Sequence, residues 1–120
     1  MNSKIRKLAI IMVTLAATAG PAGPAAGADR GMEEQIQSAR SGADHEAIAA
    51  QYDAEAKGLL AQAEQHDRMG KLYRGMELGG GKGPKFAGHC EAMAANLRTA
   101  AGQNEELAQL HRDLAAEAPQ

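Results

Sequence analysis

The side chains best able to do chemistry in this 120-residue chain are four histidines and a single cysteine. Histidine nitrogen and the sulfur of cysteine or methionine are the donors that soft and borderline ions prefer, above all copper and zinc. These residues fall into two similar groups. The first group is Asp44-His45-Glu46 with His66, and the second is His89-Cys90-Glu91 with His111.

The spacing within each group is typical of a coiled-coil helix. His66 follows His45 by 21 residues, and His111 follows Cys90 by the same interval, which is three seven-residue repeats. Other residues continue the two stripes: His45, Tyr52, Leu59, His66 and Tyr73 in the first, and Cys90, Leu97, Asn104 and His111 in the second. The sequence therefore predicts two long helices with a seam along each.

The ends of these helices are marked by capping and breaking residues. Ser41, three positions before Asp44, resembles a capping box and starts a helix over about 43–74. The run from Gly79 to Gly83 breaks that helix, and Pro84 suits the first turn of a second one over about 84–117. We expect an all-α fold in which residues 43–120 form an antiparallel helical hairpin.

The two helices also look like copies of one segment. A shift of 45 residues places Glu46-Ala47-Ile48-Ala49-Ala50 on Glu91-Ala92-Met93-Ala94-Ala95 without a gap, and places His66 on His111. Such an internal repeat indicates the architecture directly. The hairpin is thus predicted to arise from an internal duplication.

Folding the hairpin brings the two groups together. Residues at the same level of an antiparallel pair have numbers with a constant sum, and this sum is 156 both for His45 with His111 and for His66 with Cys90. A loop centred on residue 79 predicts level pairs near 158, a difference of roughly 3 Å along the helix. We therefore expect two metal sites about 30 Å apart. The open-end site would use His45, His111 and either Asp44 or Glu46, and the loop-end site His66, His89 and Cys90, with Met69 and Met93 one turn away.

Each of these residues also has a plainer interpretation. Histidines on a helical seam are often hydrogen-bonded core groups, and Met69 and Met93 are typical core fillers. Glu46 and Glu91 suit the first turn of a helix, where an acid complements the helix dipole. Cys90 with a histidine could serve as a nucleophile, but two helices offer no substrate pocket, so we expect no enzymatic activity.

The beginning of the chain predicts export. Lys4, Arg6 and Lys7 precede an apolar run, and Ala26-Gly27-Ala28 matches a cleavage site, so residues 1–28 are typical of a secretory signal. Its removal takes away three basic residues and changes the net charge from −2 to −5. That charge argues against nucleic acid and anionic membranes as partners. Residues 29–42 are polar, with a short helix expected over Met32–Arg40.

Composition favours self-association of the exported protein. With one Phe, two Tyr and no Trp, the chain cannot fill a large core. We expect a homodimer in which two hairpins form a four-helix bundle. The functional prediction is a periplasmic or secreted protein that binds copper or zinc between its helices for storage, transfer or sensing. The alternative is a non-metal envelope protein of interaction or structure, in which the unpaired Cys90 links two chains.

Overall fold

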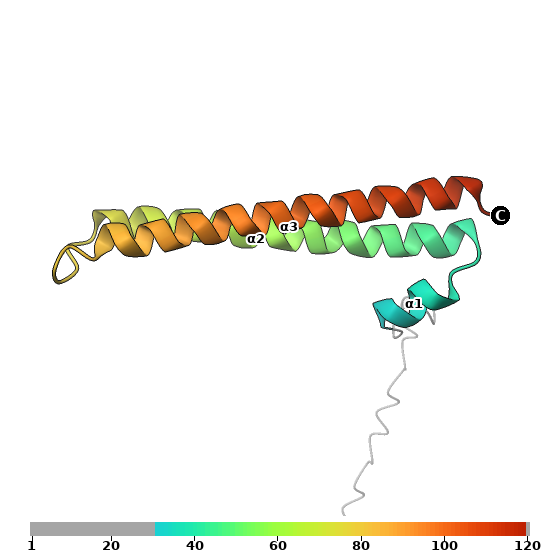
Figure 1. The fold of residues 1–120 in the computed structure, drawn as a ribbon, viewed down its shortest axis with the longest axis horizontal. Coiled ribbons are helices and arrows are strands. Elements are labelled where there is room, and N and C mark those ends of the chain that lie inside the picture. Colours follow the sequence, from blue (N-terminus) through green and yellow to red (C-terminus); the bar gives the residue numbers. More distant parts are fainter. Residues whose placement is uncertain (1–30, 120) are drawn as a thin grey trace, which may run out of the picture.

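The computed structural model describes residues 31–119, which form three helices and no strand. Helix α1 spans Met32–Ser38, α2 spans Gly42–Gly75 and α3 spans Gly83–Glu117. The two long helices lie side by side and antiparallel along their whole length, joined by the glycine loop (Figure 1). The predicted all-α hairpin is confirmed. The predicted signal, residues 1–28, lies outside the described residues.

The start of α2 is fixed by a capping box, as the sequence predicted. The Ser41 hydroxyl accepts a hydrogen bond from the Asp44 backbone N–H at 3.1 Å, while the Asp44 carboxylate accepts one from the Ser41 N–H at 2.9 Å. The Arg40 N–H donates to the same carboxylate oxygen, also at 2.9 Å. These hydrogen bonds, the backbone one from Arg40 first, lower the pKa of Asp44 to about 2.

The chain reverses between α2 and α3 through backbone conformations that favour glycine. Gly80 and Gly81 have φ angles of 73° and 68°, in the left-handed region where a side chain would clash with its own backbone. Gly83 then begins α3, with Pro84 in the first turn, where the absent N–H costs no helical hydrogen bond. The long helices end within about one residue of their predicted bounds.

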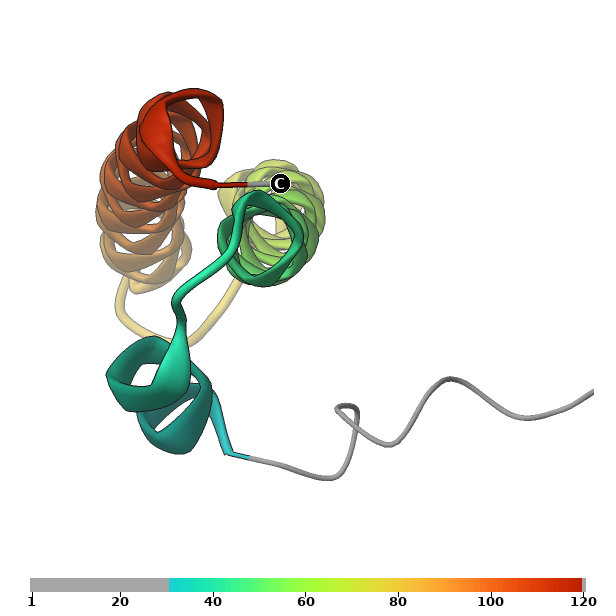
Figure 2. The ribbon, with the colours of Figure 1, turned by 90° about the vertical axis from the view of Figure 1, so that its right-hand side faces the viewer.

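At the other end of the hairpin, α1 and Pro119 contact the beginning of α2. Helix α1 lies beside the beginning of α2 (Figure 2). The Gln51 side-chain amide donates a hydrogen bond to the Gln35 side-chain oxygen. The Gly42 N–H donates to the Pro119 carbonyl at 3.3 Å, which joins the beginning of α2 to the residue beyond α3. The short helix predicted over Met32–Arg40 is present, ending at Ser38.

The interface between α2 and α3 is made of the smallest side chains. On each helix a small residue is buried at every seventh position, and we call these ten residues the alanine seam: Gly42, Ala49, Ala56, Ala63 and Gly70 of α2, with Ala87, Ala94, Ala101, Ala108 and Ala115 of α3. Such residues let helix axes approach to the lower end of the usual range of roughly 8–10 Å. The close approach leaves little interior volume.

The alanine seam also defines which residues face each other. A side chain at Gly70 would meet the Ala87 carbonyl oxygen at 3.5 Å, and the numbers of this pair sum to 157. The same sum pairs each α2 residue of the alanine seam with one α3 residue of the seam. The stripe predicted to be the seam, from His45 to Tyr73, lies three residues away from it and is only half-buried. The predicted register is therefore right, but the most deeply buried positions are the flanking alanines; of the predicted stripes only Cys90 is buried.

One flank of the hairpin carries a ladder of ion pairs. Arg74 pairs with Glu91, Asp67 with Arg98, and Asp53 with Arg112, each between α2 and α3. In all three the residue numbers sum to 165, so they repeat the seven-residue register. The hydrogen bond from Arg98 lowers the pKa of Asp67, and the same contact raises the pKa of Arg98. Because these side chains are largely exposed, the pairs specify register more than they add stability.

Large apolar side chains lie mainly outside the interface. Ile48 is the largest fully buried side chain of the described residues, whereas nine large apolar residues between 36 and 114 are exposed. Neither long helix in residues 31–119 has the continuous apolar stretch that crossing a bilayer requires. The hairpin thus has a thin interior and leaves many of its large apolar side chains exposed.

Two glycines of α3 provide a test of the close approach at the loop. A Cβ at Gly83 would lie 2.5 Å from the Tyr73 carbonyl oxygen and 2.6 Å from that of Met76, whereas nothing lies within 4 Å of one at Gly88. We predict that Gly83→Ala lowers the free energy of unfolding by about 2 kcal/mol, while Gly88→Ala raises it by roughly 0.5–1 kcal/mol through helix propensity. Urea unfolding followed by circular dichroism measures both, and equal effects would contradict the packing described.

Overfilling the alanine seam gives a second test. Ala63 is fully buried and Ala61 is exposed on the same helix. Ala63→Leu should push α2 and α3 apart and lower the free energy of unfolding by roughly 1–3 kcal/mol. Ala61→Leu is the matched control, with an expected change near zero. A stabilised Ala63→Leu variant would mean that the helices do not meet at this face.

Candidate metal centre

The register brings two histidines into contact at the open end of the hairpin. His45, from the first turn of α2, and His111, from the last two turns of α3, place their Nδ1 atoms 3.1 Å apart. Their ring centroids are 5.4 Å apart and the rings are tilted by 31°. This is the contact that the level-pair argument predicted, and we call it the open-end pair.

The surroundings of the open-end pair favour a neutral imidazole. Tyr52, one repeat after His45, stacks its ring on His111 at a centroid distance of 5.8 Å. Burial lowers the pKa of His111, and the nearby charge of His45 lowers it further. Only one proton fits between two nitrogens at this distance, so one Nδ1 donates and the other offers its lone pair.

The same separation suits two nitrogens bound to one metal ion. Zinc–nitrogen bonds of about 2.0–2.1 Å place two ligands of a tetrahedral ion roughly 3.3 Å apart, and two adjacent ligands of a square-planar ion roughly 2.9 Å apart. The observed 3.1 Å lies between these values. The open-end pair can therefore exchange a shared proton for a shared ion without a large movement of either helix.

The carboxylates predicted to complete this site have other roles in the hairpin. The Asp44 carboxylate is held by the backbone N–H groups of Arg40 and Ser41. Glu46 is exposed and lines an open surface hollow together with Arg112. Among residues 31–119 no group of three or more His, Cys, Asp and Glu is placed to hold a metal. A single hairpin thus supplies two ligands at this end.

Near the loop, His66 and Cys90 occupy the equivalent level of the hairpin, and we call them the loop-end pair. The Nδ1 of His66 is buried and has no hydrogen-bond partner within residues 31–119. Cys90 is a free thiol with an exposed fraction of 7%, and it lies against the backbone of Gly70. A buried nitrogen without a partner is costly in a helical interface. This nitrogen and the thiol are donors for a soft ion.

The remaining residues predicted for the loop-end site are more exposed than Cys90. His89 is exposed and lines a surface cavity of about 350 Å³ with Lys82, Lys85 and Phe86. Met93 has an exposed fraction of 49% on α3, and Met69 is half-buried on α2. His89 immediately precedes Cys90, and adjacent residues of a helix do not share a face. Met93 and Met69 each follow a residue of the loop-end pair by three positions, a step that keeps them on a neighbouring face, so their exposure is what separates them from the pair.

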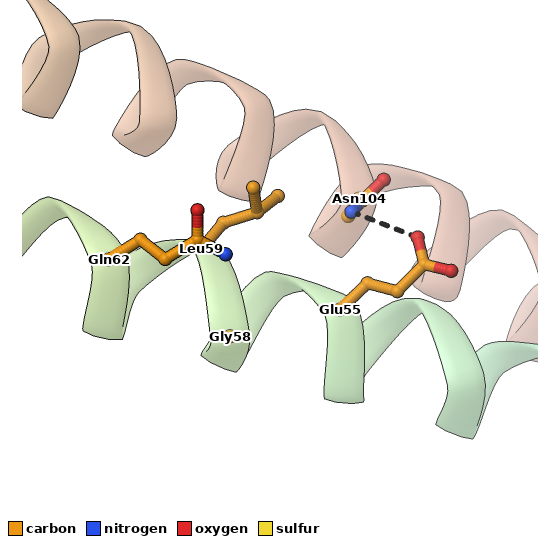
Figure 3. Close-up of a pocket in the computed structure, with 5 residues that line it drawn as sticks. All are labelled: Glu55, Gly58, Leu59, Gln62 and Asn104. Carbon is orange, nitrogen blue, oxygen red and sulfur yellow. Dashed lines mark hydrogen bonds between the residues drawn. The ribbon is translucent and has the colours of Figure 1, made fainter.

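The middle of the hairpin has an open surface pocket that the sequence did not reveal. Glu55, Gly58, Leu59, Gln62 and Asn104 line a cavity of about 300 Å³ between α2 and α3 (Figure 3). The Asn104 side-chain amide donates to the Glu55 carboxylate at 3.4 Å. Leu59 and Asn104 were predicted to be seam residues, and the available signal was an asparagine at a seam position, where an apolar residue is usual.

Comparisons with known proteins return no relative. No protein-family model, no curated protein and no solved structure matches this chain.

The open-end pair predicts a pH dependence of stability. Because the pKa of His111 is lowered in the folded protein, the unfolded chain binds a proton at a higher pH than the folded one. The stabilisation is present above the ordinary histidine value of 6.5 and is lost as pH falls from there through the lowered pKa. Unfolding measured by circular dichroism in chelator should show this slope in wild type and in His89→Gln. His111→Gln should reduce the slope, and an unchanged slope would contradict the assignment.

Proposed function

We propose that this chain is an exported helical-hairpin protein that binds a soft or borderline transition metal, copper or zinc, between α2 and α3. The observation that supports the proposal most is the open-end pair, in which two imidazole nitrogens from different helices lie 3.1 Å apart. Two nitrogens converging from opposite sides of an interface are the beginning of a bundle metal site.

The incomplete ligand set favours handling of the metal over a structural role. Structural zinc sites are usually closed by four protein ligands, whereas a site with open positions exchanges its ion and other ligands. The open-end pair leaves those positions to water, to another molecule or to a second copy of the chain. Storage, transfer or sensing of the ion fits such a site better than stabilisation of the fold.

The loop-end pair would differ in the ion that it prefers. Cys90 adds sulfur to the imidazole of His66, and thiolate with imidazole suits copper(I) and zinc. Burial of both groups keeps water away from the sulfur. A bound ion would give the His66 nitrogen the partner that it lacks in the described residues.

The duplication gains support from the alanine seam. The same shift of 45 residues that aligns the sequence blocks places each seam residue of α2 on one of α3, from Gly42 on Ala87 to Gly70 on Ala115. It also places His66 on His111 and His45 on Cys90. Two related metal sites at opposite ends of the hairpin are the expected product of such a duplication.

Export and dimerisation belong to the same proposal. The basic and apolar pattern of residues 1–28 supports export to the periplasm or the medium. The thin interior and the exposed apolar residues of α3 support assembly of two hairpins into a four-helix bundle.

The alternative function is a non-metal interaction or structural protein of the envelope. The exposed apolar side chains favour this role, since they need a partner whether or not a metal binds. A disulfide between two copies through Cys90 fits less well. The thiol is buried against Gly70, so the bond would require the loop end of the hairpin to open.

Zinc(II) titration of residues 29–120 tests the open-end pair. Wild type should take up zinc at micromolar protein concentration, measured by native mass spectrometry and isothermal titration calorimetry. His45→Ala and His111→Ala should each weaken zinc affinity tenfold or more, because each removes one of two protein ligands at that end. The exposed His89→Ala is the matched control, with unchanged affinity. Absence of uptake by wild type, or equal uptake by all variants, would refute the proposal.

Copper(I) titration tests the loop-end pair. Binding should produce a thiolate-to-copper absorption in the ultraviolet, which Cys90→Ser abolishes and His45→Ala leaves in place. Circular dichroism of each variant shows whether the hairpin is intact. An absorption that survives in Cys90→Ser would rule out the thiol as a ligand.

A further inference from the structure

The outer face of α3 carries a second apolar stripe that α2 covers only in part: the Phe86 ring stacks on Tyr73 of α2 at a centroid distance of 5.1 Å, and the rest of the stripe is partly exposed. Phe86, Met93, Leu107 and Leu114 have exposed fractions of 46%, 49%, 39% and 46%. They follow one another at intervals of seven or fourteen residues, and Ala100 occupies the position between Met93 and Leu107. This stripe has the period of a coiled-coil contact surface.

The neighbouring stripe completes a seam without charge. A second stripe follows three residues after the first four positions of the first one, and consists of His89, Asn96, Gln103 and Leu110. Together the two stripes have nine positions. None of the nine is Asp, Glu, Lys or Arg, although 23% of the chain is charged. We call these nine residues the second seam. At about 100° per residue the centre of the second seam is turned by roughly 100° from the centre of the α2 contact, taken midway between the alanine seam and the stripe from Cys90 to His111. A helix of a four-helix bundle contacts its two neighbours through faces at such an angle.

The charged residues of α3 between positions 85 and 113 occupy the rest of its circumference. Glu91, Arg98 and Arg112 form the ion pairs with α2 on one side, where Glu105 continues the same stripe, and Lys85, Glu106 and Asp113 are exposed on the adjacent side. Charge is thus absent from the second seam itself, and Lys85 lies at its edge, where it lines a surface cavity with Phe86 and His89. A surface kept free of charge in this way is expected to be buried in the working assembly.

The first stripe of the second seam, from Phe86 to Leu114, is symmetric about Ala100. Phe86 and Leu114 lie fourteen residues on either side of it, and Met93 and Leu107 lie seven on either side. An antiparallel second copy of α3 would therefore place Phe86 opposite Leu114 of the second copy and Met93 opposite Leu107 of the second copy. Ala100 would meet its own equivalent on the axis, where its small side chain allows close contact. A face that complements itself under a two-fold rotation is what an isologous dimer requires.

We propose that the second seam binds a second copy of this chain, with the α3 helices antiparallel about a two-fold axis at Ala100. The exposed apolar area of this face is on the order of 500 Å² in each copy, at the upper end of the largest patch that monomers usually expose. With the polar residues of the seam and its rim, it approaches the roughly 800 Å² per partner of a stable dimer. Because the hairpin interior consists mainly of alanine and glycine, it buries little hydrophobic area, and burial of these larger side chains between two copies would add to it.

This dimer does not depend on the proposed metal sites, so the two proposals are tested separately. Sedimentation equilibrium of residues 29–120 in excess chelator should give the mass of a dimer. Met93→Glu and Leu107→Glu should each shift the protein to monomer, raising the dissociation constant at least a hundredfold, because each places two charges in the interface. Thr99→Glu, on the charged side of α3, and Leu72→Glu, at an α2 residue with an exposed fraction of 68%, are the matched controls and should remain dimeric.

The symmetry is tested by a disulfide on the axis. In a Cys90→Ser background, Ala100→Cys should form a covalent dimer under mild oxidation, whereas Leu72→Cys should not. A monomer at all concentrations would overturn the proposal, since the second seam would then serve a different partner. A dimer that persists in Met93→Glu, or that crosslinks through Leu72→Cys and not Ala100→Cys, would place the interface on another face and overturn it equally.

Discussion

The hairpin depends on one constraint, which is the close approach of α2 and α3 along the alanine seam. A small residue at every seventh position leaves no room for the helices to slide, since a shift would bring larger neighbours into the contact. Ala63 and Ala94, for example, are fully buried although each has only a methyl group to bury. Helices that meet this closely gain dispersion contacts along their backbones, but little hydrophobic area.

The position of every other interhelical pair follows from that register. It brings His45 and His111 into contact at one end and His66 to the level of Cys90 near the other. It also aligns the ion pairs on one flank, such as Arg98 with Asp67. His45, His66 and His111 are half-buried at interface positions where most coiled coils have leucine. The fold thus gives up hydrophobic area in the same layers in which it gathers nitrogen and sulfur donors.

The thin interior and the uncharged outer face of α3 both follow from the composition of the chain, which has few large apolar residues. With few large side chains available, the chain places small ones inside the hairpin and leaves Phe86 and Leu107 on α3 exposed. Burial of these side chains by a second copy would supply the hydrophobic area that the hairpin lacks. Metal binding at the open end would add a cross-link between the two helices.

The amino-acid sequence by itself determined the helices, their ends and their register. Ser41 with Asp44 marks the start of α2, and the glycines before Pro84 mark the turn, because capping and backbone strain are local properties. The repeat and the constant sums followed from the seven-residue period. For that reason the contact of His45 with His111 could be predicted before any coordinates were known.

Only the tertiary structure decided which stripe lies deepest and which side chains meet. Periodicity cannot distinguish the alanine stripe from the histidine stripe beside it, since both repeat every seven residues, and the distance between the helix axes settles the question. The same applies to His89 and Met93, which are close to Cys90 in sequence but point away from the interface. The pocket beside Asn104 is lined by residues of both helices, and a hollow of this kind is a property of three-dimensional packing that no local pattern encodes.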